Sequence, residues 1–337
     1  MKSDLRLRLA ELLGGAFAHV SFEAALAGMP EKLRAVRPPG VPHNAWQLLE
    51  HVRICQRVIL DFSRPPGRRF PEREEEWWPE SATPADPGDW ERSAAAFRSD
   101  LADFVALVLD PASDLQALIP GGGGRSLLRQ ALVVADHTAY HAGQLVLLRQ
   151  LLGAWPPAGK AAAFDLPETA DGGEAPVDEA DLRARVLEFL RGGAAHLSFE
   201  EGVAGFPAER AGERPPGVEH SAWELVEHLR IAQRDILDWS RDPGHVSPSW
   251  PEGHWPPQGT APDAEGWRQG VATFLADRAE LVEWIADPAA DLWTPFPWGS
   301  GSNLLGQALL AADHNAYHLG QVIWVRRLLG AWDGDPS

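Results

Sequence analysis

Apolar residues recur along the chain at spacings of three and four, the pattern of one face of an α-helix, and no stretch shows the alternation of a half-buried strand. In the first half this pattern predicts four helices, over residues of about 4–28, 44–63, 88–109 and 125–152. Asn44 is a candidate N-cap of the second helix, and Gly121 to Gly124 form a tight turn into the fourth. The segment of about 64–87, rich in Pro, Trp and Glu, is expected to be irregular.

The whole pattern occurs twice, 177 residues apart. His19-Val-Ser-Phe-Glu recurs from His196, and between residues 19 and 53, 19 of the 35 positions carry the same residue as their partner. Similarity this dense predicts an all-α protein of two tandem up-down four-helix bundles related by an internal repeat. The segment 156–178, rich in Pro, Ala, Gly and acidic residues, is the expected linker, so we expect one domain over residues 1–160 and a second over 161–337.

Composition excludes several classes of function. The chain has 48 acidic against 30 basic residues and a net charge of −18, which argues against a nucleic-acid-binding protein because phosphate neutralisation needs basic surface. No run of 18 apolar residues is present to cross a membrane, and the first residues lack the apolar stretch of a signal peptide. The single cysteine, Cys55, excludes a disulfide framework and a cysteine-based zinc site, so a cytoplasmic protein is expected.

The histidines carry the candidate chemistry, since ten of the 12 form five pairs at the repeat distance of 177 residues. The sharpest motif, Asp136-His137-Thr-Ala-Tyr140-His141, lies in the predicted fourth helix. Histidines at i and i+4 share one helix face and are close enough to hold one ion. A third ligand must come from another helix, and His51 qualifies because it lies in the apolar stripe of the second helix. The candidate metal ligands are therefore His51, His137 and His141, and in the second half His228, His314 and His318.

A structural interpretation competes with metal binding, because a histidine on an apolar helix face is more often a hydrogen-bonded core residue than a ligand. Three buried imidazoles without partners would carry a heavy desolvation cost, however, and the set occurs in both halves. An imidazole triad without a thiolate or carboxylate suits Zn²⁺, and Ni²⁺ also accepts it. Three protein ligands leave a position for water or substrate, as in a catalytic zinc site.

Three polar residues beside the fourth-helix histidines, each with its partner in the other half, have two interpretations. Asp136, like Asp313, either accepts a hydrogen bond from a ligand of the neighbouring helix or is a solvated surface carboxylate. Gln144 either bonds a metal-bound water or packs at the helix interface. Tyr140 is expected to pack near the site, with substrate contact as the alternative.

Further residues near the predicted ligands are assigned supporting roles. His43 lies more than two helical turns before His51, so we expect it to cap the helix or line a pocket rim rather than coordinate the ion. His19 is expected to make a core hydrogen bond within the first helix, and Glu50 to form a salt bridge or to orient a neighbouring group. The loop around Trp77-Trp78, like that of Trp250 to Trp255, either walls an apolar pocket over the metal or simply covers the bundle.

Two motifs of the first half, each repeated in the second, are Ala45-Trp-Gln-Leu-Leu-Glu-His51 and His137-x-x-Tyr-His141-x-Gly-Gln144. Together they resemble the DinB-like superfamily, named for bacterial damage-inducible proteins, over nearly the whole of both halves. The resemblance implies a four-helix bundle with a divalent metal, often zinc or nickel, on the same six histidines. It also implies chemistry, because relatives include thiol-dependent S-transferases and a maleylpyruvate isomerase that uses a low-molecular-weight thiol. Members commonly dimerise, so the tandem resembles a covalently joined dimer.

These observations leave more than one function open. The first is a metal-dependent thiol S-transferase that joins a small molecule to an external low-molecular-weight thiol, since Cys55 is replaced by Ala232 in the second half and is no shared catalytic thiol. With water in place of the thiol, the same site would be a hydrolase. The alternative is a non-catalytic metal-binding or stress-response module. The expected assembly is a monomer acting as a covalent pseudo-dimer, or a homo-oligomer.

Overall fold

A computed structural model of the chain describes residues 5–15, 19–64, 70–156, 177–257 and 259–332. Helices make up the regular structure of these ranges, and the single antiparallel bridge between Leu118 and Ser126 belongs to no strand. The expected domain boundary near residue 160 lies outside the described residues. No helix in the described ranges has the length and apolar character needed to cross a bilayer.

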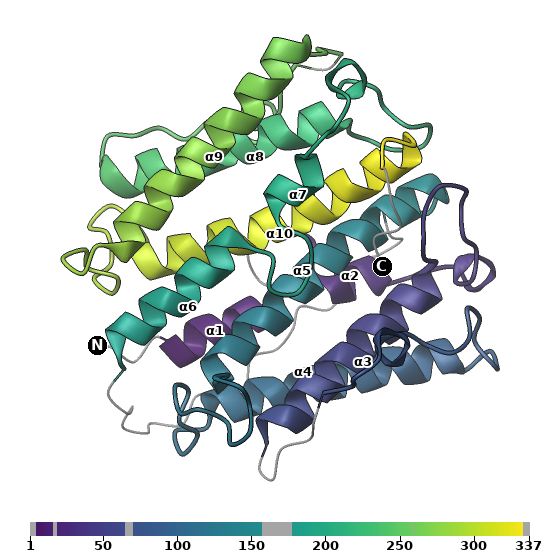
Figure 1. Ribbon diagram of the computed structural model, residues 1–337, viewed down its shortest axis with the longest axis horizontal. Coiled ribbons are helices and arrows are strands. Elements are labelled where there is room, and N and C mark those ends of the chain that lie inside the picture. The colour runs from purple at the N-terminus through teal and green to yellow at the C-terminus, as the bar shows by residue number, and fades with distance from the viewer. Residues whose placement is uncertain (1–4, 16–18, 65–69, 157–176, 258, 333–337) are drawn as a thin grey trace.

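The two halves repeat one order of helices (Figure 1). The first half contains α1 (Leu5–Leu13), α2 (Phe22–Leu26), α3 (Ala45–Ser63), α4 (Asp89–Leu109) and α5 (Leu127–Leu151). The second half contains α6 (Glu179–Arg191), α7 (Phe199–Val203), α8 (Ala222–Arg241), α9 (Ala264–Ala286) and α10 (Leu304–Leu328). Single turns of 3₁₀-helix lie at η1 (Glu31–Leu33), η2 (Glu74–Trp77) and η3 (Ala208–Arg210). In each half one shorter helix (α1 or α6) and three long ones (α3–α5 or α8–α10) pack around a shared core, which confirms the tandem helical bundles.

The second, third and fourth predicted helices are confirmed as α3, α4 and α5, with ends within two residues of those expected. The prediction of one helix over residues 4–28 is wrong, because α1 ends at Leu13 and α2 starts at Phe22. Gly15 has a φ of 68°, a left-handed conformation that ends a helix, and the Ser21 side chain caps α2 by accepting from the Ala24 amide at 3.1 Å. The Gly-Gly and Ser signals for this break are present in the sequence.

Local capping fixes where the histidine-bearing helices begin. The predicted N-cap Asn44 accepts a hydrogen bond from the Gln47 amide at 2.9 Å, and the Gln47 side chain accepts from the Asn44 amide at 3.2 Å. Ser221 and Glu224 form the same capping box at the start of α8. The capped starts place His51 and its second-half partner at the same height on the two equivalent helices.

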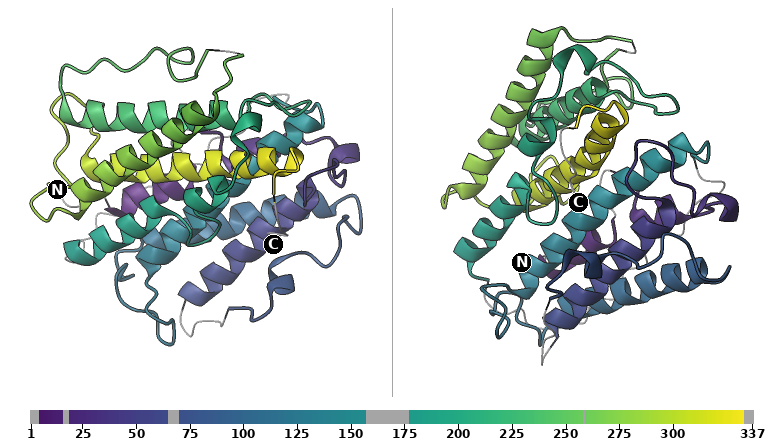
Figure 2. Two further views of the ribbon diagram at one scale, coloured as in Figure 1. Left: turned by 45° about the horizontal axis from the view of Figure 1, so that its top comes forward. Right: turned by 45° about the vertical axis from the view of Figure 1, so that its right-hand side comes forward.

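Helices α5 and α10 lie side by side at the centre of the molecule, where the two halves meet (Figures 1 and 2). A Cβ atom on Gly143 would lie 2.0 Å from the carbonyl oxygen of Tyr317, and one on Gly320 would lie 2.2 Å from that of Tyr140. The helices therefore touch backbone to backbone at two reciprocal points, which only glycine permits. Both helices are buried on nearly all sides, since the other half covers the face that a lone bundle would expose.

Candidate metal centres

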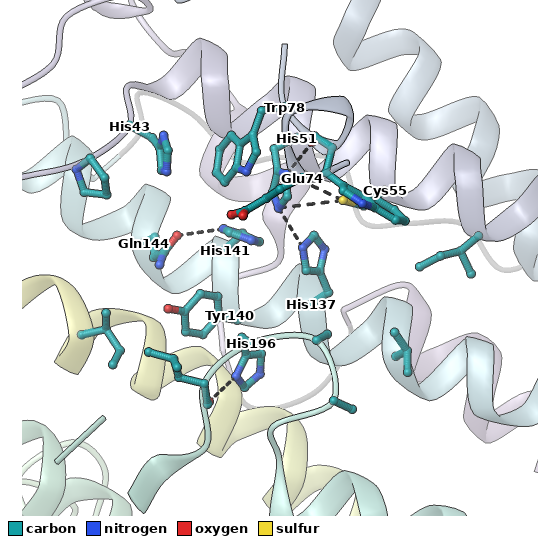
Figure 3. Close-up of a pocket in the computed structure, with 18 of the residues that line it drawn as sticks. His43, His51, Cys55, Glu74, Trp78, His137, Tyr140, His141, Gln144 and His196 are labelled. Carbon is teal, nitrogen blue, oxygen red and sulfur yellow. Dashed lines mark hydrogen bonds between the residues drawn. The ribbon is translucent and has the colours of Figure 1, made fainter. Parts of the chain in front are cut away.

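In the first half, two imidazoles from different helices meet nitrogen to nitrogen (Figure 3). The Nδ1 atom of His51 on α3 lies 2.7 Å from the carbonyl oxygen of Trp77 in η2. A carbonyl oxygen only accepts, so Nδ1 carries the proton and the lone pair of His51 resides on Nε2. This Nε2 lies 3.0 Å from Nε2 of His137 on α5.

The third predicted ligand of the first half joins the same group. The ring centroid of His141 lies 4.5 Å from that of His137 and 4.8 Å from that of His51. Its Nδ1 donates to Oε1 of Gln144 at 2.8 Å, which leaves the lone pair on Nε2. Gln144 thus orients a candidate ligand, a role that neither sequence interpretation of this residue included.

The second half reproduces this arrangement. The donor atoms of His228, His314 and His318 all lie within 4.8 Å of one another. Nε2 of His228 lies 3.0 Å from Nε2 of His314, and Nδ1 of His318 donates to Gln321 at 2.8 Å. The carbonyl oxygen that accepts from His228 Nδ1, at 2.8 Å, is that of His254.

A cysteine adds a further donor to the first half alone. Donor atoms of His51, Cys55 and His137 lie within 4.8 Å of one another, and the Cys55 sulfur is 3.7 Å from Nδ1 and 3.8 Å from Nε2 of His51. A single cysteine in the sequence argued against a cysteine-based zinc site, whereas the structure places this thiol one helical turn from His51 against the same cluster. Ala232 occupies the equivalent place in the second half.

Burial keeps the six imidazoles neutral. It lowers the pKa of His51 and of His228 to about 4. Burial, together with repulsion from the neighbouring imidazoles, holds the pKa values of the other members well below the ordinary value of 6.5; these are His137, His141, His314 and His318. Neutral imidazole is the form that binds a metal ion, so the cluster is in this form at neutral pH.

A tryptophan lies between two imidazoles beside each cluster. Trp78 stacks on His43 at a centroid distance of 3.8 Å and on His51 at 3.8 Å. Trp255 of the second half stacks on His220 at 3.9 Å and on His228 at 4.0 Å. Trp78 thus fixes the ring plane of a candidate ligand, and the loop walls the site rather than only covering the bundle. His43 lines the pocket and does not cap the helix, which Asn44 does.

The aspartates beside the motif histidines contact the opposite half of the chain. Oδ1 of Asp136 lies 3.1 Å from Nε2 of His196, and Oδ2 of Asp313 lies 2.8 Å from Nε2 of His19. Asp136 is 2% exposed, so it is not solvated, and the histidine that it contacts is not a candidate metal ligand; both interpretations of the aspartates are wrong. The two histidines make core contacts as expected, from loops before α2 and α7 rather than from within a helix.

The aspartates affect the pKa of the histidines that they contact, and these histidines also stack on tyrosine rings. Burial would lower the pKa of His19, but attraction by the Asp313 carboxylate and the Val20 carbonyl raises it above 6.5. His19 stacks on Tyr317, and His196 on Tyr140, each at 4.4 Å with 9° between the ring planes. Each tyrosine also meets the edge of the adjacent candidate ligand of its own helix. The loop of one half therefore supports the histidine cluster of the other.

Three residues that depart from the repeat lie close together beside the second cluster. Asp235 stands where the first half has Val58, and it contacts His245 at 2.7 Å and His254 at 3.6 Å. These are the two histidines without partners in the repeat. The polar residue in the apolar stripe of α8 is thus explained by its imidazole neighbours, which the sequence spacing did not reveal.

The glutamates beside His51 and His228 form local salt bridges. Glu50 accepts from Arg53 at 2.7 and 2.8 Å, and Glu227 accepts from Arg230 at 2.9 to 3.1 Å. The prediction of salt bridges is confirmed.

A cavity of about 510 Å³ opens onto the first cluster. Its wall includes His51, His137, His141 and Trp78 (Figure 3). Trp77 also lines the cavity. A cavity of this volume is within the usual range for small-molecule sites. The first cluster is therefore open to a ligand that enters from the cavity.

Comparison with known proteins supports the same division of the chain. The model of the DinB superfamily matches residues 17–145 and again residues 194–322. The two matched stretches are separated by the repeat distance of 177 residues and cover most of both halves. No curated protein and no solved structure matches the chain.

Proposed function

The chain belongs to the DinB superfamily, which it matches twice in tandem, and we propose that it is a metal-dependent thiol S-transferase that uses an external low-molecular-weight thiol. In this proposal each half binds one divalent ion, Zn²⁺ in preference to Ni²⁺. The ligands are His51, His137 and His141, and then His228, His314 and His318. The observation that carries the proposal is the convergence of three neutral imidazoles in each half. In each half two of them use Nδ1 for a hydrogen bond to an oxygen acceptor, which leaves Nε2 for the metal.

The donor set fits a divalent transition ion. Zn–N bonds of about 2.0–2.1 Å in a tetrahedral site place neighbouring ligand nitrogens roughly 3.4 Å apart. The paired Nε2 atoms of His51 and His137 are 3.0 Å apart, and those of His228 and His314 are also 3.0 Å apart. Outer hydrogen bonds to a backbone carbonyl or an amide oxygen, as made here, are the usual support of metal-bound histidines.

A divalent ion with three protein ligands lowers the pKa of a thiol or water in its open position. The chain's own residues supply binding and orientation. Trp78 and Gln144 hold two of the imidazoles in place, and the cavity beside them gives room for a small molecule.

The nucleophile comes from outside the chain. Burial raises the pKa of the Cys55 thiol far above its ordinary value, so without a metal contact it stays protonated at neutral pH. Its counterpart in the second half is Ala232. A thiolate supplied by a small molecule in the cavity meets this need, whereas a buried protonated cysteine does not.

Metal analysis combined with a thiol-consumption assay tests the proposal. The purified protein is expected to hold two divalent ions per chain, and His141→Ala and His318→Ala are each expected to remove one. Consumption of a panel of thiols by the electrophile 1-chloro-2,4-dinitrobenzene should depend on the metal, fall in His141→Ala and return after reloading of chelator-treated protein. Absence of bound metal under every loading condition would refute the proposal. Bound metal without thiol consumption would favour the non-catalytic metal-binding module or the hydrolase.

The contacts between the halves support a monomeric pseudo-dimer. The two aspartate–histidine pairs and the two glycine contacts are reciprocal, as in an isologous dimer whose subunits are joined in one chain. Light scattering should give the mass of one chain; a mass of two or more chains would contradict this part of the proposal.

A further inference from the structure

The cysteine of the chain lies inside the first histidine cluster. Cys55 comes one helical turn after His51 on α3, so both side chains are on the same helix face. It is 6% exposed and lines the cavity over the cluster. Its sulfur and the donor nitrogens of His51 and His137 all lie within 4.8 Å of one another (Figure 3). The sulfur therefore belongs to the group of atoms that would surround an ion.

The thiol and an ion compete for the same lone pair of His51. The Cys55 sulfur lies 3.7 Å from Nδ1 and 3.8 Å from Nε2 of this ring. Nδ1 already gives its proton to the Trp77 carbonyl, so the acceptor that remains for the thiol is the lone pair on Nε2. An ion bound to Nε2 takes that acceptor away. The buried thiol is then left without this partner directly beside the ion.

The distances fit a sulfur ligand on the same ion. Zn–N bonds of about 2.0–2.1 Å and a Zn–S bond of about 2.3 Å in a tetrahedral site place nitrogen and sulfur roughly 3.6 Å apart. The separation of the Cys55 sulfur from Nε2 of His51 is 3.8 Å. Thiolate and imidazole are both ligands that Zn²⁺ accepts, so the two donor types are compatible in one site.

The second half has no equivalent of this sulfur. Ala232 is the repeat partner of Cys55, and the donor group of the second half consists of His228, His314 and His318. The nearest acidic residue further along α8, Asp235, contacts His245 at 2.7 Å instead. Within the described ranges the two clusters therefore differ by one potential ligand.

We propose that Cys55, as a thiolate, is a fourth protein ligand of the first ion, whereas the second ion has three. The proposal rests on the proposed function for the presence of the ion, and it adds a chemical difference between the two centres. The S–H bond of Cys55 breaks when the ion binds, and its proton passes to solvent, as it does for other metal-coordinated thiols. The thiolate offsets part of the charge of the buried ion, which three neutral imidazoles do not.

An external thiol then binds differently at the two centres. At the second centre it enters the position that three histidines leave open. At the first centre it replaces Cys55, since the incoming thiol gives its proton to the departing thiolate while its sulfur takes the same place on the ion. The net charge of the buried site does not change in this exchange, and Cys55 returns to its neutral form.

Absorption spectra of the full chain loaded with Co²⁺ test whether Cys55 is a ligand. A thiolate bound to Co²⁺ gives an intense charge-transfer absorption in the near ultraviolet, which imidazole ligands do not give. The protein is reduced with a phosphine and freed of small thiols, so that Cys55 is the source of any thiolate. We expect this absorption in the wild type. We expect its loss in Cys55→Ala, which installs the residue of the second half, while two Co²⁺ ions per chain remain bound.

Two control variants assign the absorption to the first centre. His318→Ala disrupts the second centre and should keep the full absorption with one Co²⁺ ion per chain. Cys55→Ser keeps a side chain of similar size and should lose the absorption as Cys55→Ala does. Thermal unfolding shows whether each variant retains the fold.

The possible results separate the ligand from the proposed function. Two bound Co²⁺ ions without thiolate absorption in the wild type would overturn the role of Cys55 and leave the proposed function standing. Equal absorption in the wild type and Cys55→Ala would overturn it as well. A chain that binds no Co²⁺ under any loading condition would refute both the role of Cys55 and the proposed function.

Discussion

Substitution of Gly320 by alanine tests whether the two halves touch backbone to backbone. The added Cβ would lie 2.2 Å from the carbonyl oxygen of Tyr140, and a carbon–oxygen contact needs roughly 3.2 Å. Helices α5 and α10 would have to separate by about 1 Å at this point. Because the obstructing atom is backbone, no side-chain rotation relieves the contact.

The expected loss of stability follows from two opposing effects. Overpacking of a well-packed interior costs about 1–3 kcal/mol, and a backbone obstacle places this case at the upper end. Alanine in place of glycine within a helix gains about 1 kcal/mol. The net destabilisation is therefore about 2 kcal/mol, which corresponds to a fall in Tm of about 3 °C for a cooperative chain of this length.

Urea unfolding measures this difference against a control in the same helix. A Cβ on Gly306 would meet only the Asn303 side chain, at 3.3 Å, so Gly306→Ala is expected to keep the free energy of unfolding at the wild-type value or to raise it by up to about 1 kcal/mol. Gly143→Ala should behave like Gly320→Ala, since its Cβ would lie 2.0 Å from the Tyr317 carbonyl. Wild-type stability in both interface variants would refute the close contact of α5 and α10.

Three further variants probe the first site. Cys55→Ala gives the first half the alanine of the second, and two metal ions per chain should remain by mass spectrometry because three imidazoles suffice; loss of one ion would make the thiol an essential ligand. Gln144→Ala removes the acceptor that orients His141, and the metal affinity of the first half should fall about 10–100-fold in a chelator competition. Asp136→Ala leaves the buried imidazole of His196 without its carboxylate and should cost about 1–3 kcal/mol in urea unfolding; an unchanged unfolding midpoint would show that the pair contributes nothing.

The sequence predicted what depends on local spacing. Apolar periodicity located α3 and α4 because each presents one face to its own core, and it also located α5, which is buried on nearly all sides. The grouping of His137 with His141 required only that residues four apart share a helix face. The position of His51 opposite them followed from the apolar stripe of α3, and the structure brings the three rings together.

The contacts between the halves could not be predicted from the spacing of residues within one segment. Asp313 lies 2.8 Å from His19, which is 294 positions away, and nothing in the periodicity of either segment identifies the other. The sequence nevertheless indicates that the two halves pack together, because the fourth helix is apolar around most of its circumference. A helix of that kind has to be covered on every side, and a single bundle covers only one face. The apolar outer face of α5 therefore predicts that the second bundle packs against it.

Some contacts around the candidate metal centres are the same in both halves, whereas one residue beside them differs. The stacking of Tyr140 on His196 and of Tyr317 on His19 has the same distance, 4.4 Å, and the same 9° angle in both directions. The residue one helical turn after the α3 ligand differs between the halves, by contrast, since Cys55 of the first half has Ala232 as its partner in the repeat. In a homodimer both properties would be forced to be equal, because every substitution occurs twice. A covalent tandem removes that constraint, so it can keep the reciprocal contacts that support both clusters while a thiol lies beside only one of them.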